Sequence, residues 1–176
     1  FLTFSVRSYA EIVNNVEVKG NERIALETIV IFGDITIGKN YEPSDITLMI
    51  KKLYETNFFS NISIELQDGQ LNIIVAENPI INLLVLKGEK AEKYRSAITE
   101  KLILREKTSF LENYVKSDIN LLKTFYRQLG FYFVKIDLDV EKLQRNRVNL
   151  IYSIDKGEKA KIAKIYFLGA KKIREK

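Results

Sequence analysis

The sequence predicts an α+β fold of tandem β-α-α-β-β domains, each a three-stranded mixed sheet with two helices on one face. The first observation is an apolar, strand-like phrase that ends in glycine and occurs three times, at residues 13–20, 81–88 and 162–169. Self-similarity of this kind indicates a repeated structural unit. The second observation is that helical and then strand-like periodicity follow the first two copies in the same order.

Composition is that of an ordinary globular protein and excludes several kinds of chemistry. The 176 residues are 46% hydrophobic and 29% charged, and they include no cysteine and no histidine. Disulfides and thiolate catalysis are therefore excluded, and so is the commonest general base and metal ligand. The net charge of +5 is spread along the chain, which favours a lysine-rich solvated surface over a site for nucleic acid or an acidic membrane.

The beginning of the chain indicates a piece of a longer protein. No apolar run approaches the ~18–20 residues of a membrane span. The first residue is Phe, and residues 1–9 are too short and too polar for a signal peptide. We therefore expect any targeting segment or membrane anchor to lie outside this sequence.

The first unit starts with a strand over residues 11–19, after a leader at residues 1–10. The apolar residues of this strand alternate only towards its end, which predicts a β-bulge near Asn14 and Asn15. Gly20 then turns the chain towards the first helix.

Two helices follow in this unit. Apolar spacing predicts the first over residues 23–32, closed by Gly33 in the left-handed conformation and followed by a loop over 34–43. Ser44 is the expected N-cap of the second helix, which has the clearest helical spacing in the chain. Asn57 is its expected left-handed stop.

A hairpin completes the first unit. Residues 61–67 alternate apolar and polar side chains, and Asp68 and Gly69 form a two-residue type I′ turn. Ile74 and Ala76 add apolar side chains to the second face of the returning strand, which predicts that this strand is central. The strand over 61–67 then lies at an edge of the sheet.

The second unit repeats this order. We expect a strand over residues 80–87, a helix over 92–104, and a second helix that Gly130 ends. The last two strands are connected by a loop through residues 144–146. The first of these strands, residues 134–140, again lies at an edge.

Glu77, Asn78 and Pro79 form the expected linker between the units. A linker this short is no flexible tether, so it predicts two domains that touch at a restricted hinge. The expected boundaries are 1–10 for the leader, 11–78 for the first domain, 79–158 for the second, and 159–176 for the truncated start of a third.

Catalytic and metal-binding motifs are scarce. Asp137 and Asp139 share one strand face and could bind a metal or exchange protons, but the surrounding alternation favours a solvated face. Phe131, Tyr132 and Phe133 could stack on single-stranded nucleic acid, but such a trio more often enters the core at the start of a strand. A KH domain is excluded because no G-x-x-G loop joins the helices. The sequence thus predicts a non-enzymatic protein without cofactors or a metal.

The open sheet edges are the remaining candidates for function. An edge strand presents unpaired backbone groups that can accept an extended peptide, with little demand on the sequence of that peptide. The alternative is a charged and passive edge. The candidate edge residues are Ile62, Ser63, Ile64 and Glu65 in the first unit, and Lys135, Ile136, Asp137 and Leu138 in the second.

In residues 148–169, alternating apolar residues lead through Gly157 into the third copy of the phrase. This stretch resembles the junction between successive POTRA domains. Residues 53–64 and 75–81 resemble other parts of the same domain. Together these stretches resemble the N-terminal POTRA domains of BamA-like outer-membrane protein assembly factors. The sequence departs from the family in two places: an asparagine follows the glycine of the phrase only after Gly20, and Asn57 stands where the family often has glycine.

The resemblance implies a function that composition does not show. Membership of such a family would imply unfolded outer-membrane proteins as clients and accessory assembly lipoproteins as partners. It would also imply a C-terminal β-barrel of the same protein beyond this sequence. It also implies the periplasm of a Gram-negative bacterium. Apart from the resemblance, we expect a monomer that binds no nucleic acid. The alternatives are the POTRA arm of a two-partner secretion protein or related transporter, and a passive spacer or docking scaffold.

Overall fold

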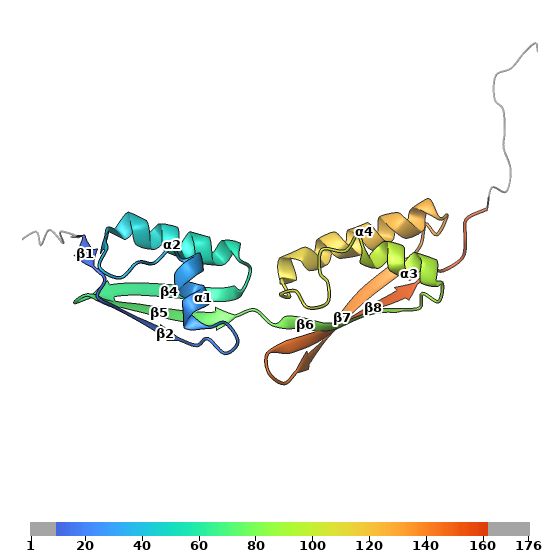
Figure 1. Ribbon diagram of the computed structural model, residues 1–176. Coiled ribbons are helices and arrows are strands. Elements are labelled where there is room, and N and C mark those ends of the chain that lie inside the picture. The colour runs from blue at the N-terminus through green and yellow to red at the C-terminus, as the bar shows by residue number, and fades with distance from the viewer. Residues whose placement is uncertain (1–9, 162–176) are drawn as a thin grey trace, which may run out of the picture.

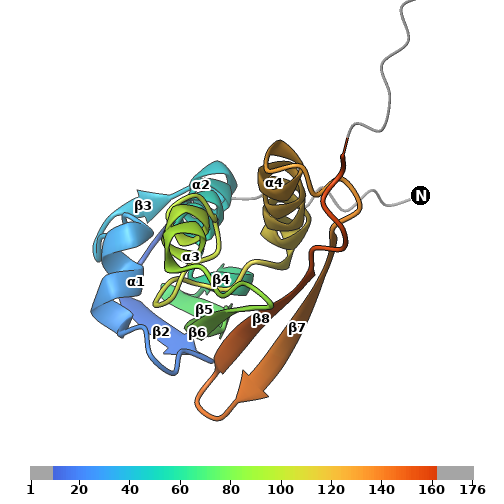
Figure 2. The same cartoon turned by 90° about the vertical axis from the view of Figure 1, so that its right-hand side faces the viewer.

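The computed structural model describes residues 10–161 of the chain. Two units follow one another, and in each the helices cover one face of a sheet (Figure 1). Viewed along the row, the helices of both units lie on the same side of the strands (Figure 2). Most of the expected leader, and the expected third domain from residue 162 onward, lie outside the described residues.

The first unit has a three-stranded mixed sheet in the order β2-β5-β4, with β2 parallel to β5 and β4 antiparallel to it. The fold class predicted from the sequence is thus confirmed for this unit. Its elements are β1 (Glu11–Ile12), β2 (Asn15–Lys19), α1 (Leu26–Phe32), β3 (Asn40–Tyr41), α2 (Pro43–Glu55), β4 (Phe59–Gln67) and β5 (Gln70–Glu77).

The second unit has the same topology, in the strand order β6-β8-β7. The strand predicted to be central is central in both units, and β4 and β7 are edge strands. The elements are β6 (Ile80–Lys87), α3 (Glu92–Thr99), a short 3₁₀ helix η1 (Glu112–Tyr114), α4 (Val115–Gln128), β7 (Lys135–Leu143) and β8 (Arg147–Asp155).

Each unit has its own hydrophobic core between sheet and helices. Ile29 of α1, Leu53 of α2 and Leu71 of β5 are fully buried in the first core. Tyr126 of α4 and Tyr152 of β8 are fully buried in the second. The second face of the central strand is open instead, since Ile74 is 54% exposed. The apolar character of Ile74 therefore identified a central strand, although the side chain is not buried.

The first strand differs from the expectation. The structure divides residues 11–19 into β1 and β2, and β1 pairs with β3 in a separate two-stranded ribbon. Gly38 N–H donates to Val13 O and Val13 N–H donates to Lys39 O, so Val13 is bound to the loop before β3. The expected bulge near Asn14 is thus a change of sheet, because segment 36–41 supplies new backbone partners.

The expected helix ends were less accurate than the strands. Gly33 is in the right-handed region, and Asp34 has the positive φ of 55° instead. Ser44 is not the N-cap of α2. Glu42 is, in a reciprocal capping box with Asp45, and Pro43 takes the first helical position, where its missing N–H costs nothing.

The helix expected over 92–104 ends at Thr99. Beyond it, the N–H groups of Ile103 and Leu104 donate to the fully buried carboxylate of Asp118, at 2.9 and 3.0 Å. A side chain on α4 therefore replaces the helical acceptors, which apolar spacing alone does not reveal.

The other predicted positions of positive φ were correct. Asn57 has a φ of 60°, and Gly130 has a φ of 94° directly after α4. Asp68 and Gly69 both have positive φ, as a type I′ turn requires. Local chemistry decides such positions, because few residue types tolerate this part of the backbone map.

Candidate protein-interaction edges and the domain junction

The candidate residues of the first unit lie on β4. Ile62 and Ile64 face the core and are buried, whereas Ser63 and Glu65 lie on the helix-free face and are exposed. The Ile62 N–H donates to the hydroxyl of Tyr54 at 3.1 Å, so it points away from β5. Because hydrogen bonding alternates along an antiparallel pair, the Ile64 N–H points to the same open edge.

A hollow of about 220 Å³ lies beside this edge. Ile64 and Leu66 of β4 form one wall, and Pro43 and Ile46 of α2 form another. Glu11, Tyr41 and Glu42 complete its lining.

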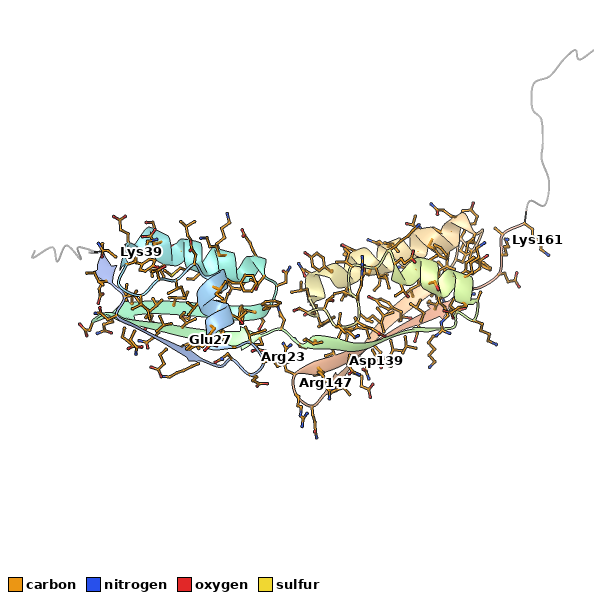
Figure 3. The ribbon with its side chains drawn as sticks, viewed as in Figure 1. Arg23, Glu27, Lys39, Asp139, Arg147 and Lys161 are labelled. Atoms are coloured by element: carbon orange, nitrogen blue, oxygen red, sulfur yellow. The ribbon has the colours of Figure 1, made fainter. Side chains whose placement is uncertain are left out.

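The candidate residues of the second unit lie on β7. Ile136 is buried and Leu138 is half-buried on the core side, and Lys135 and Asp137 are exposed on the other side. Figure 3 shows Asp139 and Arg147 on the helix-free side of this sheet. In the part of the chain that the structure describes, no backbone group outside the sheet bonds to β7.

The opposite edge of the second sheet is covered. The loop before η1 lies along β6, where Ile81 N–H donates to Thr108 O at 2.9 Å and Lys107 N–H donates to Ile81 O at 2.7 Å. The Leu84 N–H donates to the carboxylate of Glu106 at 3.0 Å. The part of β6 from Ile81 to Leu84 is thus bonded on both sides, whereas β7 has no such cover within residues 10–161.

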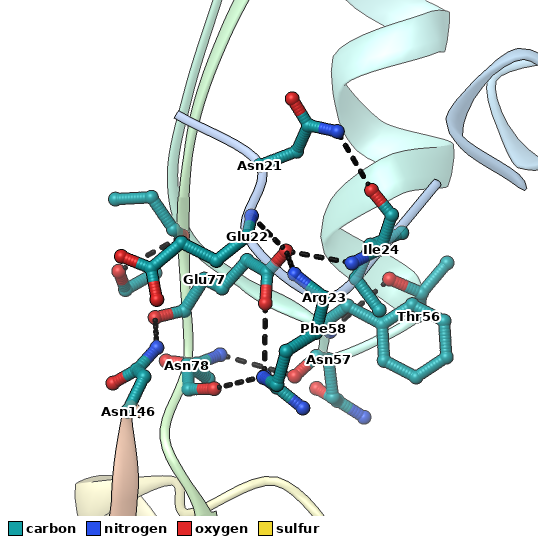
Figure 4. A network of polar contacts seen from close by, with 12 residues as sticks. Asn21, Glu22, Arg23, Ile24, Thr56, Asn57, Phe58, Glu77, Asn78 and Asn146 are labelled. Carbon is teal, nitrogen blue, oxygen red and sulfur yellow. Dashed lines mark hydrogen bonds and ion pairs between the residues drawn. The ribbon is translucent and has the colours of Figure 1, made fainter. Parts of the chain in front are cut away.

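The expected hinge residues lie between the units, and Figure 4 shows hydrogen bonds to the carbonyl groups of two of them, Glu77 and Asn78. Glu77 O accepts the side-chain amide of Asn146, Asn78 O accepts the guanidinium of Arg23, and Pro79 O accepts the N–H of Phe110. These bonds measure 2.7 to 2.9 Å. Partners from both units therefore hold the linker.

Glu77 also closes the first unit. Its buried carboxylate accepts the N–H groups of Glu22, Arg23 and Ile24 at 2.8 to 2.9 Å, and it pairs with the Arg23 guanidinium at 3.1 Å. Burial opposes ionisation, but the three backbone donors and Arg23 outweigh it and lower the pKa of Glu77. α1 begins at Leu26, later than expected, because Ala25 before it is extended and interrupts the helical backbone.

The second unit has a related contact with the charges exchanged. Here the acid, Glu89, lies in the turn after β6, and the base, Lys156, follows the central strand at 2.8 Å. Glu89 also accepts the hydroxyl of Tyr126 and the N–H of Ala91. Desolvation raises the pKa of Glu89, but these donors and Lys156 lower it overall. Sequence reasoning missed both contacts because the partners are far apart along the chain.

Gly20 and Gly88, which end the first two copies of the phrase, have a tertiary role. A Cβ atom on Gly20 would lie 2.1 Å from Val75 O, and one on Gly88 would lie 2.2 Å from Ile154 O. Both glycines have positive φ. The turn can therefore approach the central strand only where no side chain is present.

The acidic residues and the aromatic trio noted in the sequence do not come together in the part of the chain that the structure describes. Among residues 10–161, no group of three or more acidic side chains is placed to hold a metal ion, and no helix is long and apolar enough to cross a membrane. Phe131 packs against Tyr126, whereas Tyr132 and Phe133 are exposed before β7 begins. The aromatic trio thus places one ring at the core.

Comparison with known proteins agrees with this architecture. The POTRA family model, described as "Surface antigen variable number repeat", matches residues 79–157. The outer membrane protein assembly factor BamA of Neisseria meningitidis is 32% identical over 160 residues, which are 89% of this chain and 20% of the relative. BamA of Neorickettsia risticii is 24% identical over 161 residues, with 92% and 22% covered. The chain thus spans about a fifth of the length of these relatives.

A solved structure shows the same fold. The N-terminal domain of Omp85 from Thermosynechococcus elongatus superposes with a TM-score of 0.53 at 14% identity, over 81% of this chain and 62% of that one. Both units share the β-α-α-β-β topology, and the family model covers the second. The second unit is therefore a POTRA domain by its family model, and the chain as a whole has the fold of tandem POTRA domains and is similar in sequence to BamA proteins.

Proposed function

We propose that this chain is a periplasmic, non-catalytic part of an outer-membrane protein assembly factor. In this proposal it captures unfolded outer-membrane proteins as added strands on β4 and β7, and it docks accessory assembly proteins. The names of the relatives support the assembly role. The chain spans about a fifth of the length of these relatives. Client and partner binding are therefore proposed only for these two domains.

One observation carries the proposal: within residues 10–161, β4 and β7 each lie at an edge of their sheet with no strand on the outer side. β4 and β7 are each 9 residues long, and an extended peptide of similar length can pair with either. Main-chain hydrogen bonds supply the affinity of such pairing, so one edge can accept many client sequences. Unfolded outer-membrane proteins are rich in strand-forming segments and fit this requirement.

The test is an NMR titration of the labelled chain with a peptide from a strand of an outer-membrane protein. We expect perturbed amides at Ile64 and Leu66, which border the open edge of β4, and along β7. In the matched control peptide, proline replaces alternate residues and removes the ladder donors. Direct capture is wrong if the unmodified peptide at millimolar concentration shifts no amide signal of β4 or β7. It is also wrong if the proline peptide binds as tightly as the unmodified one.

The hydrogen-bonded linker favours a second role, as a spacer that presents partner-docking surfaces at a set angle. Leu66→Pro separates the two roles, because the Leu66 N–H borders the open edge of β4 and its loss bars an added strand while the β4–β5 hydrogen bonds remain. Capture predicts loss of client assembly with partner binding intact. A docking role predicts that Leu66→Pro leaves client assembly unchanged, whereas changes at the junction weaken it.

A further inference from the structure

The open edges of the two units differ in charge. On its helix-free face, β7 carries the carboxylates of Asp137, Asp139 and Glu141 at every second position, with Lys135 at the start of the strand. The corresponding face of β4 carries Asn61, Ser63 and Glu65, with one carboxylate. The overall charge of the chain is +5, so the acidic row on β7 runs against the composition.

The neighbouring strand does not neutralise this row. Asp137, Asp139 and Glu141 face Ser153, Ile151 and Asn149 of β8, none of which is basic. Glu141 accepts the side-chain amide of Asn149 at 2.8 Å. Within residues 10–161, none of the three carboxylates is in an ion pair. The row therefore faces solvent at the open side of the sheet.

The core side of β7 places a second, independent requirement on the side chains of an added strand. Leu138 and Val140 are only half-buried and pack at the margin of the second core. A strand added to β7 would place its inward side chains beside them. Apolar side chains at these positions would extend the core, and polar ones would be desolvated without partners.

We propose that β7 selects extended segments with lysine or arginine at the outward positions and apolar residues between them, whereas β4 accepts neutral segments. This inference rests on the proposed capture of strands. Directly opposed side chains in an antiparallel pair lie about 4.5–5.5 Å apart, where opposite charges stabilise and like charges destabilise the pair. An acidic segment is thus rejected at β7 although the backbone groups are available.

The test uses the 176-residue chain and three peptides with valine at every second position and lysine, threonine or glutamate in between. Amide shifts report β4 and β7 separately. At β7 we expect the lysine peptide to bind about tenfold more tightly than the threonine peptide, and the glutamate peptide to bind more weakly than either. Raising the salt concentration to about 0.5 M should remove most of this preference, since exposed charges are screened.

Neutralising variants give the matched control. The triple variant Asp137→Asn, Asp139→Asn, Glu141→Gln keeps the strand shape and should bind the three peptides alike at β7. An equal loss of charge away from the edge should leave the lysine preference intact. That control combines Glu55→Gln, Glu100→Gln and Glu112→Gln, all at exposed positions.

The outcomes separate the two proposals. Equal affinity of β7 for the lysine and glutamate peptides overturns charge selection and leaves strand capture standing. Binding at β4 with none at β7 has the same meaning, since β7 is then a passive edge. If none of the peptides perturbs either strand, strand capture itself is wrong and charge selection is overturned with it.

Discussion

Gly20→Ala tests whether close approach, and not backbone conformation alone, explains the glycine that ends the repeated phrase. The new Cβ would lie 2.1 Å from Val75 O, so the turn must move away from β5. Gly38→Ala is the control, because Gly38 has nearly the same φ, 86° against 83°, with nothing within 4 Å of the new Cβ. Left-handed backbone costs a non-glycine residue about 1–2 kcal/mol. Overpacking adds about 1–3 kcal/mol.

We therefore expect Gly20→Ala to destabilise the first unit by about 2–5 kcal/mol and Gly38→Ala by about 1–2 kcal/mol. Urea unfolding followed by circular dichroism measures the loss, and amide exchange at Leu71 and Leu150 assigns it to the first or second unit. Both residues are fully buried on the central strands. Equal destabilisation by the two variants would refute the close-approach argument.

Three further predictions concern the buried polar contacts. Glu77→Gln should destabilise the first unit by about 1–3 kcal/mol at pH 7. Folding lowers the pKa of Glu77, so its stabilisation is present above the unfolded pKa of about 4.3 and is lost as the pH falls through the folded pKa. Urea titrations should therefore give converging stabilities for variant and wild type at low pH. A stability difference that is independent of pH would contradict this. Tyr126→Phe removes the 2.8 Å hydrogen bond to Glu89 and should cost the second unit about 1 kcal/mol in the same assay, whereas no loss would mean that Lys156 alone satisfies the carboxylate. Asn146→Gly keeps the positive φ of 48° but removes the side-chain donor to Glu77 O. NMR relaxation should then show the two units tumbling more independently. Unchanged relaxation would show that the other hydrogen bonds of the linker are enough to hold the two units together.

The candidate edges could be predicted because strand chemistry is local. Alternation identified β4 and β7, and the apolar Ile74 identified β5 as central, which together place β4 at an edge. The same alternation did not show that the loop before η1 covers β6, because those hydrogen bonds join Ile81 to residues more than twenty positions away. Nor did it reveal Tyr54, whose hydroxyl binds the edge of β4.

The hydrogen bonds of the junction could not be predicted in this way, although the position of the linker was expected. Asn146 has a signal in its residue type, since asparagine is enriched at positive φ, but its partner Glu77 lies in the other unit. Glu77 and Glu89 look like ordinary surface acids in the sequence. Their burial depends on N–H groups and basic side chains that only the folded turns bring together.

By itself, the sequence determined the repeat, the strand order and the tight turns, because side-chain alternation and positive φ depend on neighbouring residues. The tertiary structure decided where α1 begins, where α3 ends, where the first strand changes sheet, and which carboxylates are buried. The physical reason is that unpaired backbone groups at helix ends and sheet edges take the nearest partner in space. For Ile24 that partner is Glu77, and for Leu104 it is Asp118.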